Sequence, residues 1–166
     1  MRKLVIGAGA ATAVAALGTI AAYAATATGS MNVTLTITKQ CTVVSATTMA
    51  FPSTGLLNAN VDQTSDITVL CTNGTTYDVG LDKGVNGASV TTRQMIGAGG
   101  TPDLVDYTLY RDASRTQNFG QTVGTDTAPG TGDGTNKITT VYGRVPIQSS
   151  KKPDSYSDTV AITVTY

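Results

Sequence analysis

The sequence predicts an all-β sandwich, and three observations support this class. Short segments in which apolar and polar residues alternate recur along the chain, and a strand has a side-chain period of two. Turn signals such as Asn73-Gly74 separate these segments. Thr is the commonest residue, Gly and Val are abundant, and Ser and Asn recur in the turn-like segments, which favours strands and tight turns over long helices. The pattern indicates a Greek-key sandwich of immunoglobulin type, with about seven strands.

The predicted strands run from near the N-terminus to the final residue. The first is Met31-Asn32-Val33-Thr34-Leu35-Thr36-Ile37-Thr38, which is apolar at every odd position. Later strands are expected over residues 41–44, 65–71, 77–81, 88–96, 104–112, 138–147 and 156–166, with an interruption near Gly143. Residues 120–136 are nearly all small or polar, so we expect a long flexible loop there.

The N-terminus is organised like a signal peptide. Arg2 and Lys3 precede an uncharged stretch rich in Ala and Gly, and Ala22-Tyr23-Ala24 matches a small-residue cleavage site. A retained transmembrane anchor is the alternative, because the uncharged run is long enough to span a bilayer. The shortage of Leu and Ile favours cleavage. We therefore expect a signal peptide over residues 1–24, an N-terminal extension over 25–38 and one domain over 39–166.

Cys41 and Cys71 are the two cysteines of the chain. In an exported protein an even pair predicts a disulfide. This bond would tie two neighbouring strands together and contribute roughly 3–4 kcal/mol on the chain-entropy model. The spacing excludes a redox-active CxxC motif, and two ligands are too few for a metal site.

The composition argues against several functional classes. The chain has no His and no Glu, which excludes Ser-His-Asp and Cys-His nucleophile systems and most zinc sites. The formal net charge is zero and only 13% of residues are charged, which argues against electrostatic binding of nucleic acid. Asp126 and Asp133 lack the spacing of a calcium loop. A hydrolase with paired Asp residues is an unfavoured alternative, so we expect no catalytic residue, metal or cofactor.

The two ends of the domain predict an incomplete sandwich. The chain ends on an apolar strand and supplies nothing to close the edge beside it, while an extra strand lies at the opposite terminus. Donor-strand complementation, in which that extra strand fills a neighbour's groove, would repair the edge. Burying Met31, Val33, Leu35 and Ile37 would release roughly 6–12 kcal/mol before ordering costs. The alternative is that residues 31–37 form the first strand of a complete domain.

Several motifs resemble those of a known family. They are the alternating strand followed by Cys41-Thr42-Val43, the stretch Tyr107-Thr108-Leu109-Tyr110-Arg111-Asp112-Ala113-Ser114-Arg115, the stretch Gly143-Arg144-Val145-Pro146-Ile147, and the ending from Tyr156 to Tyr166. Together they resemble the spore coat protein U domain proteins, the family of the archaic chaperone–usher pilus subunits. The resemblance covers nearly all of the expected mature chain, in the right order.

The resemblance implies a structural pilin. Such a subunit lacks its last strand, is exported to the periplasm, binds a dedicated chaperone, and is ordered at an outer-membrane usher into a homopolymer that ends in a tip subunit. It would form a thin extracellular pilus for attachment and biofilm formation. By resemblance, Met31, Val33, Leu35 and Ile37 are the donor residues, and the acceptor groove is lined by Val160, Ile162, Val164 and Tyr166. The alternative is a secreted, complete β-sandwich that binds a glycan or protein and folds without residues 25–38.

Two further groups of residues have both a functional and a structural interpretation. Arg111, Asp112 and Arg115 could anchor a ligand, but a surface ion pair or a braced turn is the more common role of such residues. Tyrosines at positions 107, 110, 142, 156 and 166 could form a sugar-binding platform, but aromatic residues more often pack in cores or subunit contacts.

Overall fold

The computed structural model describes residues 23–99 and 103–166, and within them it has nine strands and no helix. The strands are β1 (Cys41–Ala46), β2 (Val61–Cys71), β3 (Thr76–Leu81), β4 (Arg93–Gly97), β5 (Leu104–Tyr110), β6 (Ala128–Thr131), β7 (Asn136–Val145), β8 (Tyr156–Ser157) and β9 (Ile162–Thr165). No helix in the described residues is long and apolar enough to span a membrane. Residues 1–22 of the predicted signal peptide lie outside the described part.

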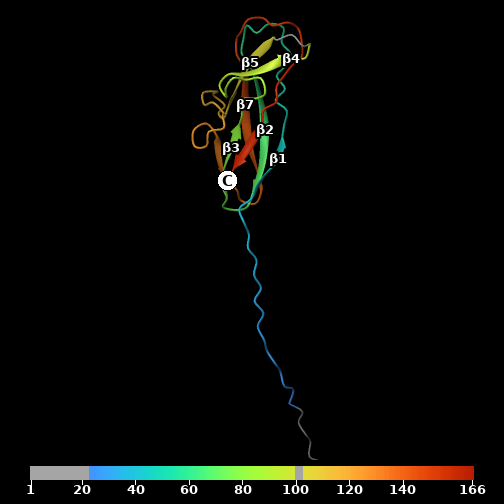
Figure 1. The fold of residues 1–166 in the computed structure, drawn as a ribbon, viewed down its shortest axis with the longest axis vertical. Helices are drawn as coiled ribbons and strands as arrows, with labels where there is room; N and C mark the ends of the chain where they lie inside the picture. The colour runs from blue at the N-terminus through green and yellow to red at the C-terminus, as the bar shows by residue number, and fades with distance from the viewer. Residues whose placement is uncertain (1–22, 100–102) are drawn as a thin grey trace, which may run out of the picture. The chain divides into compact units, whose positions relative to one another are not determined.

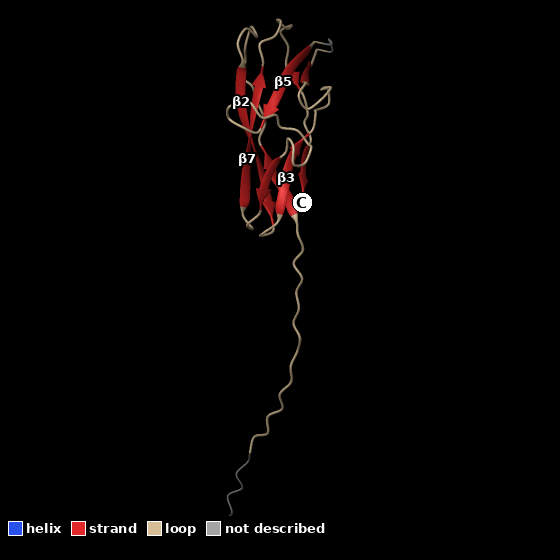
Figure 2. Cartoon of the chain, turned by 90° about the vertical axis from the view of Figure 1, so that its left-hand side faces the viewer, coloured by secondary structure: helices blue, strands red, loops and turns tan. Residues whose placement is uncertain are grey.

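All the strands belong to the unit formed by residues 36–166 and pair antiparallel in two sheets. One sheet has the order β1-β2-β7-β5-β4-β8, and the other has the order β6-β3-β9. Figures 1 and 2 show β2 and β7 running along the domain, with β4 and β5 towards one end and the C-terminus towards the other. This confirms the predicted fold class, an all-β sandwich of immunoglobulin type.

The core lies between the inward faces of the two sheets. The alternation of β2, β3 and β5 in the sequence matches their burial, as expected for strands with one face on a core. The buried apolar residues are Ile67, Val69, Cys71, Tyr77, Val79, Leu81, Val105, Tyr107, Leu109, Phe119, Val141 and Val145. β1 departs from this pattern because five of its six residues are exposed, so the part of the sandwich beside β1 is thinly covered.

The Cys41–Cys71 disulfide predicted from the sequence is confirmed. The two cysteines lie directly opposite each other where β1 pairs with β2. Next to the disulfide, the Gln40 backbone N–H donates to Thr72 Oγ1 (3.1 Å), and the Thr72 N–H donates to the Gln40 carbonyl (2.9 Å). Gln40, which connects the N-terminal extension to β1, is therefore held against the end of β2.

The expectation of a flexible loop over residues 120–136 was wrong. This region contains β6, which pairs with β3. Thr127 Oγ1 donates to Asp78 Oδ1 (2.7 Å), and the Thr122 N–H donates to Asp126 Oδ1 (2.7 Å). These bonds order a segment whose composition alone resembles a linker.

Two strand boundaries also differ from the prediction. Residues 89–92 form a tight turn, in which the Thr92 N–H donates to the Ser89 carbonyl (3.1 Å), so the strand starts only at Arg93. β7 runs through Gly143 without interruption. A Cβ at Gly143 would lie 2.8 Å from Met49 Sδ and 2.9 Å from Phe51 Cζ, so the glycine makes room for these two side chains.

Candidate subunit-binding groove

Two chain segments border an opening into the sandwich. Residues 41–55, here called the N-terminal lip, comprise β1 and the segment that follows it. Residues 155–166, here called the C-terminal lip, comprise β8, a crossing segment and β9. Because β1, β8 and β9 are the end strands of their sheets, each lip carries strand edges without a partner strand in the described residues. Such edges can accept an added strand.

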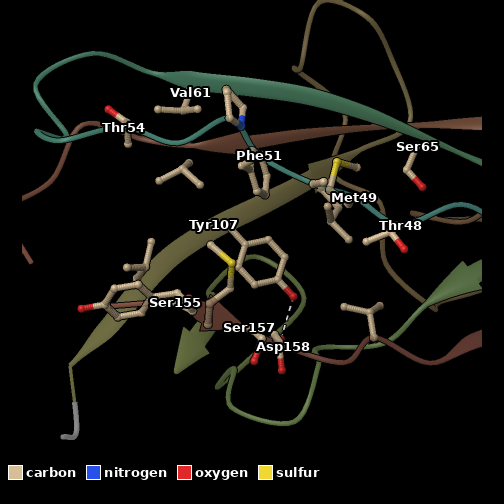
Figure 3. A pocket seen from close by; sticks show the side chains of 18 of the residues that line it. Thr48, Met49, Phe51, Thr54, Val61, Ser65, Tyr107, Ser155, Ser157 and Asp158 are labelled. Atoms are coloured by element: carbon tan, nitrogen blue, oxygen red, sulfur yellow. Dashed lines mark hydrogen bonds between the residues drawn. The ribbon is translucent and has the colours of Figure 1, made fainter. Parts of the chain in front are cut away.

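A pocket of about 870 Å³ opens between the lips and reaches the core. Residues 46–55 form one side of it and residues 151–160 with Ile162 form the other. Figure 3 shows Met49 and Phe51 on one side, with Tyr107 and Asp158 across from them. Its floor includes core side chains, among them Ile67, Leu81 and Val141. The domain thus leaves part of its own core open along the lips.

The predicted acceptor residues are only partly brought together at this groove. Val160, Ile162 and Val164 pack against the core, and Val160 and Ile162 also line the pocket. Val164 does not line the pocket, and Tyr166 is 56% exposed.

The expectation of one continuous strand over residues 156–166 was wrong. β8 pairs with β4 in the larger sheet, whereas β9 pairs with β3 in the smaller one. The residues between β8 and β9 cross from one sheet to the other. The C-terminal lip is therefore made of two edges joined by a crossing segment.

Hydrogen bonds accepted by the carboxylates of Asp158 and Asp82 hold the crossing segment. The Tyr107 hydroxyl donates to Asp158 Oδ2 (2.6 Å), and the Val85 N–H donates to Asp158 Oδ1 (3.0 Å). At the other end of the crossing, the Ala161 N–H donates to Asp82 Oδ1 (2.9 Å). Burial, followed by the Asp158 hydrogen bond, raises the pKa of Tyr107 far above its ordinary range. These hydrogen bonds tie the crossing segment to β5 and to the loop after β3.

A buried arginine lies close to this crossing and was not recognised from the sequence. Arg93 is fully buried, and its guanidinium donates to four backbone carbonyls at 2.6–3.0 Å. These carbonyls belong to Leu81, Asp82, Val90 and Phe119. Burial lowers the pKa of Arg93 from its ordinary value. One feature of the sequence indicates its burial. Arg93 and Met95 are two residues apart, so they lie on the same face of β4, and Met95 lines the pocket.

The four predicted donor residues are exposed and lie outside any strand. Met31, Val33, Leu35 and Ile37 are 83%, 83%, 86% and 78% exposed. Residues 23–40 contain no strand, so the structure gives no first strand to a complete domain at this position. Four large apolar side chains are thus exposed in alternation along residues 31–37.

Arg111 and Asp112, two of the charged residues with both a functional and a structural interpretation, form hydrogen bonds within the domain. Asp112 accepts bonds from the Thr116 and Gln117 N–H groups, as expected for a braced turn. Arg111 does not pair with Asp112 but donates to the Thr127 carbonyl (2.7 Å). These contacts favour the structural interpretation of the segment.

Arg115 and Arg144 form a cluster around Asp62. Arg144 binds Asp62 through two hydrogen bonds (2.7 and 2.8 Å), and Arg115 lies 3.4 Å from the same carboxylate. The Arg115 guanidinium also lies over the Tyr142 ring at 5.8 Å.

Within residues 23–99 and 103–166, no group of three or more His, Cys, Asp or Glu side chains is placed to hold a metal ion.

The Asp62 cluster predicts a loss of stability in acid. The hydrogen bond from Arg144 lowers the pKa of Asp62 below its ordinary value. A carboxylate whose pKa is lower in the folded than in the unfolded state stabilises the domain above its unfolded pKa of about 4, and this contribution is lost as the pH falls from there through the lower pKa of the folded state. The thermal midpoint of the Asp62→Asn variant should therefore fall less steeply than that of the parent between pH 5 and 2. The parent protein measured in the same pH series is the control, and an equally steep fall of both midpoints would contradict a stabilising role for the Asp62 carboxylate.

Comparison with known proteins agrees with this geometry. A family model described as the Spore Coat Protein U domain matches residues 27–163. Protein U of Myxococcus xanthus is 32% identical over 159 residues, which covers 87% of this chain and 88% of that protein. The family match therefore includes the N-terminal extension as well as the sandwich.

A solved structure has a similar fold. It is the chaperone–tip adhesion subunit pre-assembly complex, CsuC–CsuE, from the archaic chaperone–usher Csu pili of Acinetobacter baumannii. The TM-score is 0.60 at 16% identity, and the match covers 79% of this chain but only 41% of the other. At this identity the similarity concerns the fold alone.

Proposed function

The chain belongs to the Spore Coat Protein U domain family, and on this premise we propose that it is a structural pilin that polymerises by donor-strand complementation. The observation that carries the proposal is that one chain combines an open groove in its domain with an exposed apolar segment in its extension. The domain has a pocket of about 870 Å³ that opens its core between the two lips, whose strand edges have no partner strand in the described residues, and the extension has four large apolar side chains that are at least 78% exposed.

In the proposed fibre, the extension of one subunit fills the groove of the next. Main-chain hydrogen bonds from the donor would satisfy the edges of the lips, and alternate side chains would fill the pocket. Four buried apolar side chains release roughly 6–12 kcal/mol before ordering costs, which is comparable to the stability of a whole domain. The contact is head to tail, so it extends a filament instead of closing a dimer.

The proposal also assigns the parts of the chain and its partners. Residues 1–24 direct export and are removed, residues 25–38 are the donor extension, and residues 39–166 are the pilin domain. A periplasmic chaperone covers the groove until an outer-membrane usher exchanges it for the next subunit, and a separate tip subunit ends the fibre. The assembled fibre lies outside the cell and serves attachment and biofilm formation, a mechanical and not a catalytic role.

Expression of the full chain with an archaic-type chaperone and usher tests this function. We expect thin surface fibres under the electron microscope, and a ladder of oligomers when the fibres are run unheated in SDS. A matched chain that lacks residues 25–38 should be exported without forming either. Folded monomers from both chains would contradict the proposal and favour a secreted binding module.

A further inference from the structure

We infer a specific register for the donor strand, an inference that rests on the proposed function. In it, residues 31–37 of one subunit lie antiparallel to residues 156–162 of the next. Met31 then lies opposite Ile162, and Ile37 lies opposite Tyr156. The competing register is shifted by four residues, with Met31 opposite Tyr166 and Ile37 opposite Val160.

The position of the open space is the first argument. The pocket is lined by residues 151–160 and Ile162 of the C-terminal side, but by none of residues 163–166. Tyr166, which the competing register would cover, is 56% exposed and does not line the pocket. Tyr156, in contrast, lines the pocket and packs against the core. Large donor side chains therefore find room beside residues 156–162.

Length is the second argument. From Tyr156 to Ile162 there are six residue steps, the same number as from Met31 to Ile37. At about 3.3 Å per step, the donor segment measures roughly 20 Å when extended. In the inferred register its four large side chains lie opposite pocket-lining residues from Tyr156 to Ile162, whereas in the competing register Met31 and Val33 lie opposite Tyr166 and Val164, which do not line the pocket.

The narrow end of the groove is the third argument, and it also selects the strand direction. The Cα atoms of β1 and β9 come within 8 Å of each other, whereas two strands that flank a third lie about 9.5 Å apart. This end must widen to accept any strand and tolerates only small side chains. The donor face continues before Met31 with Gly29, Ala27 and Ala25. The antiparallel direction brings these small residues beside β9, while the parallel direction would place Ile37 at the narrow end.

Asp158 is the polar residue in the proposed contact, and its carboxylate oxygens already have hydrogen-bond partners. Leu35 lies opposite Asp158, whose two carboxylate oxygens accept bonds from the Tyr107 hydroxyl, the Val85 N–H and the Asn86 side chain. Covering Asp158 with a leucine therefore leaves no unpaired carboxylate oxygen beneath it. Val33 lies opposite Val160, so an apolar pair forms at the centre of the contact.

Cysteine pairs in the polymerised full-length chain distinguish the two registers. Val33→Cys with Val160→Cys places the thiols opposite each other in the inferred register, and Val33→Cys with Val164→Cys does so in the competing register. After mild oxidation, we expect a covalent ladder on non-reducing denaturing gels for the first pair only. Peptide mapping should join position 33 of one chain to position 160 of another. The single variants should give no covalent ladder.

The other outcomes of the experiment distinguish an incorrect register from an incorrect function. A covalent ladder from the second pair, or from neither pair while fibres are visible by microscopy, overturns the register and leaves the pilin proposal in place. Failure of the unmodified chain to polymerise removes the proposed function itself. If Val33→Cys alone prevents fibre formation, Met31→Cys combined with Ile162→Cys or with Tyr166→Cys gives the same discrimination.

Discussion

Replacing Leu35 with aspartate should abolish fibre formation while the domain itself stays folded. In the proposed contact this side chain is buried near the centre of the donor segment, so the substitution removes roughly 1.5–3 kcal/mol of apolar burial. It also buries a carboxylate in the groove, and in the inferred register this carboxylate lies opposite Asp158, so desolvation and like-charge repulsion cost several kcal/mol more. Because Leu35 is 86% exposed within its own chain, the substitution removes almost no packing from an unassembled subunit.

Thr34→Asp is the matched control for this prediction. Thr34 lies next to Leu35 but on the opposite, polar face of the segment, so its side chain should point out of the groove. Electron microscopy and unheated SDS gels should show fibres from Thr34→Asp and only subunits from Leu35→Asp. Equal polymerisation of the two variants would contradict insertion of the odd-numbered face.

Replacing Arg93 with methionine should destabilise the domain by on the order of 5 kcal/mol. Methionine keeps much of the side-chain volume but supplies no donor to the carbonyls of Leu81, Asp82, Val90 and Phe119. A buried polar group left without its partner costs about 1–3 kcal/mol, and water reaches some of these groups once the cavity relaxes. The loss should appear as a lower urea midpoint with an unchanged slope.

Arg93→Lys separates the charge from the hydrogen-bond geometry. Lysine retains the positive charge but offers one nitrogen in place of three, so it can serve only some of the four carbonyls. We expect its urea midpoint to lie between those of the parent and of Arg93→Met. A loss below about 1 kcal/mol for Arg93→Met would show that these carbonyls do not depend on the guanidinium.

Short-range patterns in the sequence were sufficient to predict the sandwich and the disulfide. The alternation of Ile67, Val69 and Cys71 directly reports the buried face of β2, because the side-chain period of a strand is local. Cys41 and Cys71 are the two cysteines of the chain, so their pairing followed once export was inferred. The period of two in residues 31–38 predicts only a strand; its role as a donor was inferred from the family resemblance and stays a prediction.

Features that depend on contacts between distant residues could not be predicted from the sequence. The alternation of residues 156–166 is unbroken, but bonds to Asp82 and from Tyr107 make the chain cross between sheets at Asp158 and beyond. Residues 120–136 resemble a linker in composition, but Asp78 on β3 orders them through Thr127. The burial of Arg93 depends on carbonyls 3 to 26 residues away in the sequence.

The central claim is that the domain lacks one strand and that the N-terminal extension supplies it. Thermal unfolding of two oxidised proteins tests this most directly: residues 39–166 alone, and residues 39–166 with residues 28–38 attached after Tyr166 through a flexible linker. We predict that only the second gives a stable monomer with a cooperative transition, because its own donor fills the groove. Cooperative melting of residues 39–166 alone at the temperature of the grafted protein would contradict the claim and show that the sandwich is already complete.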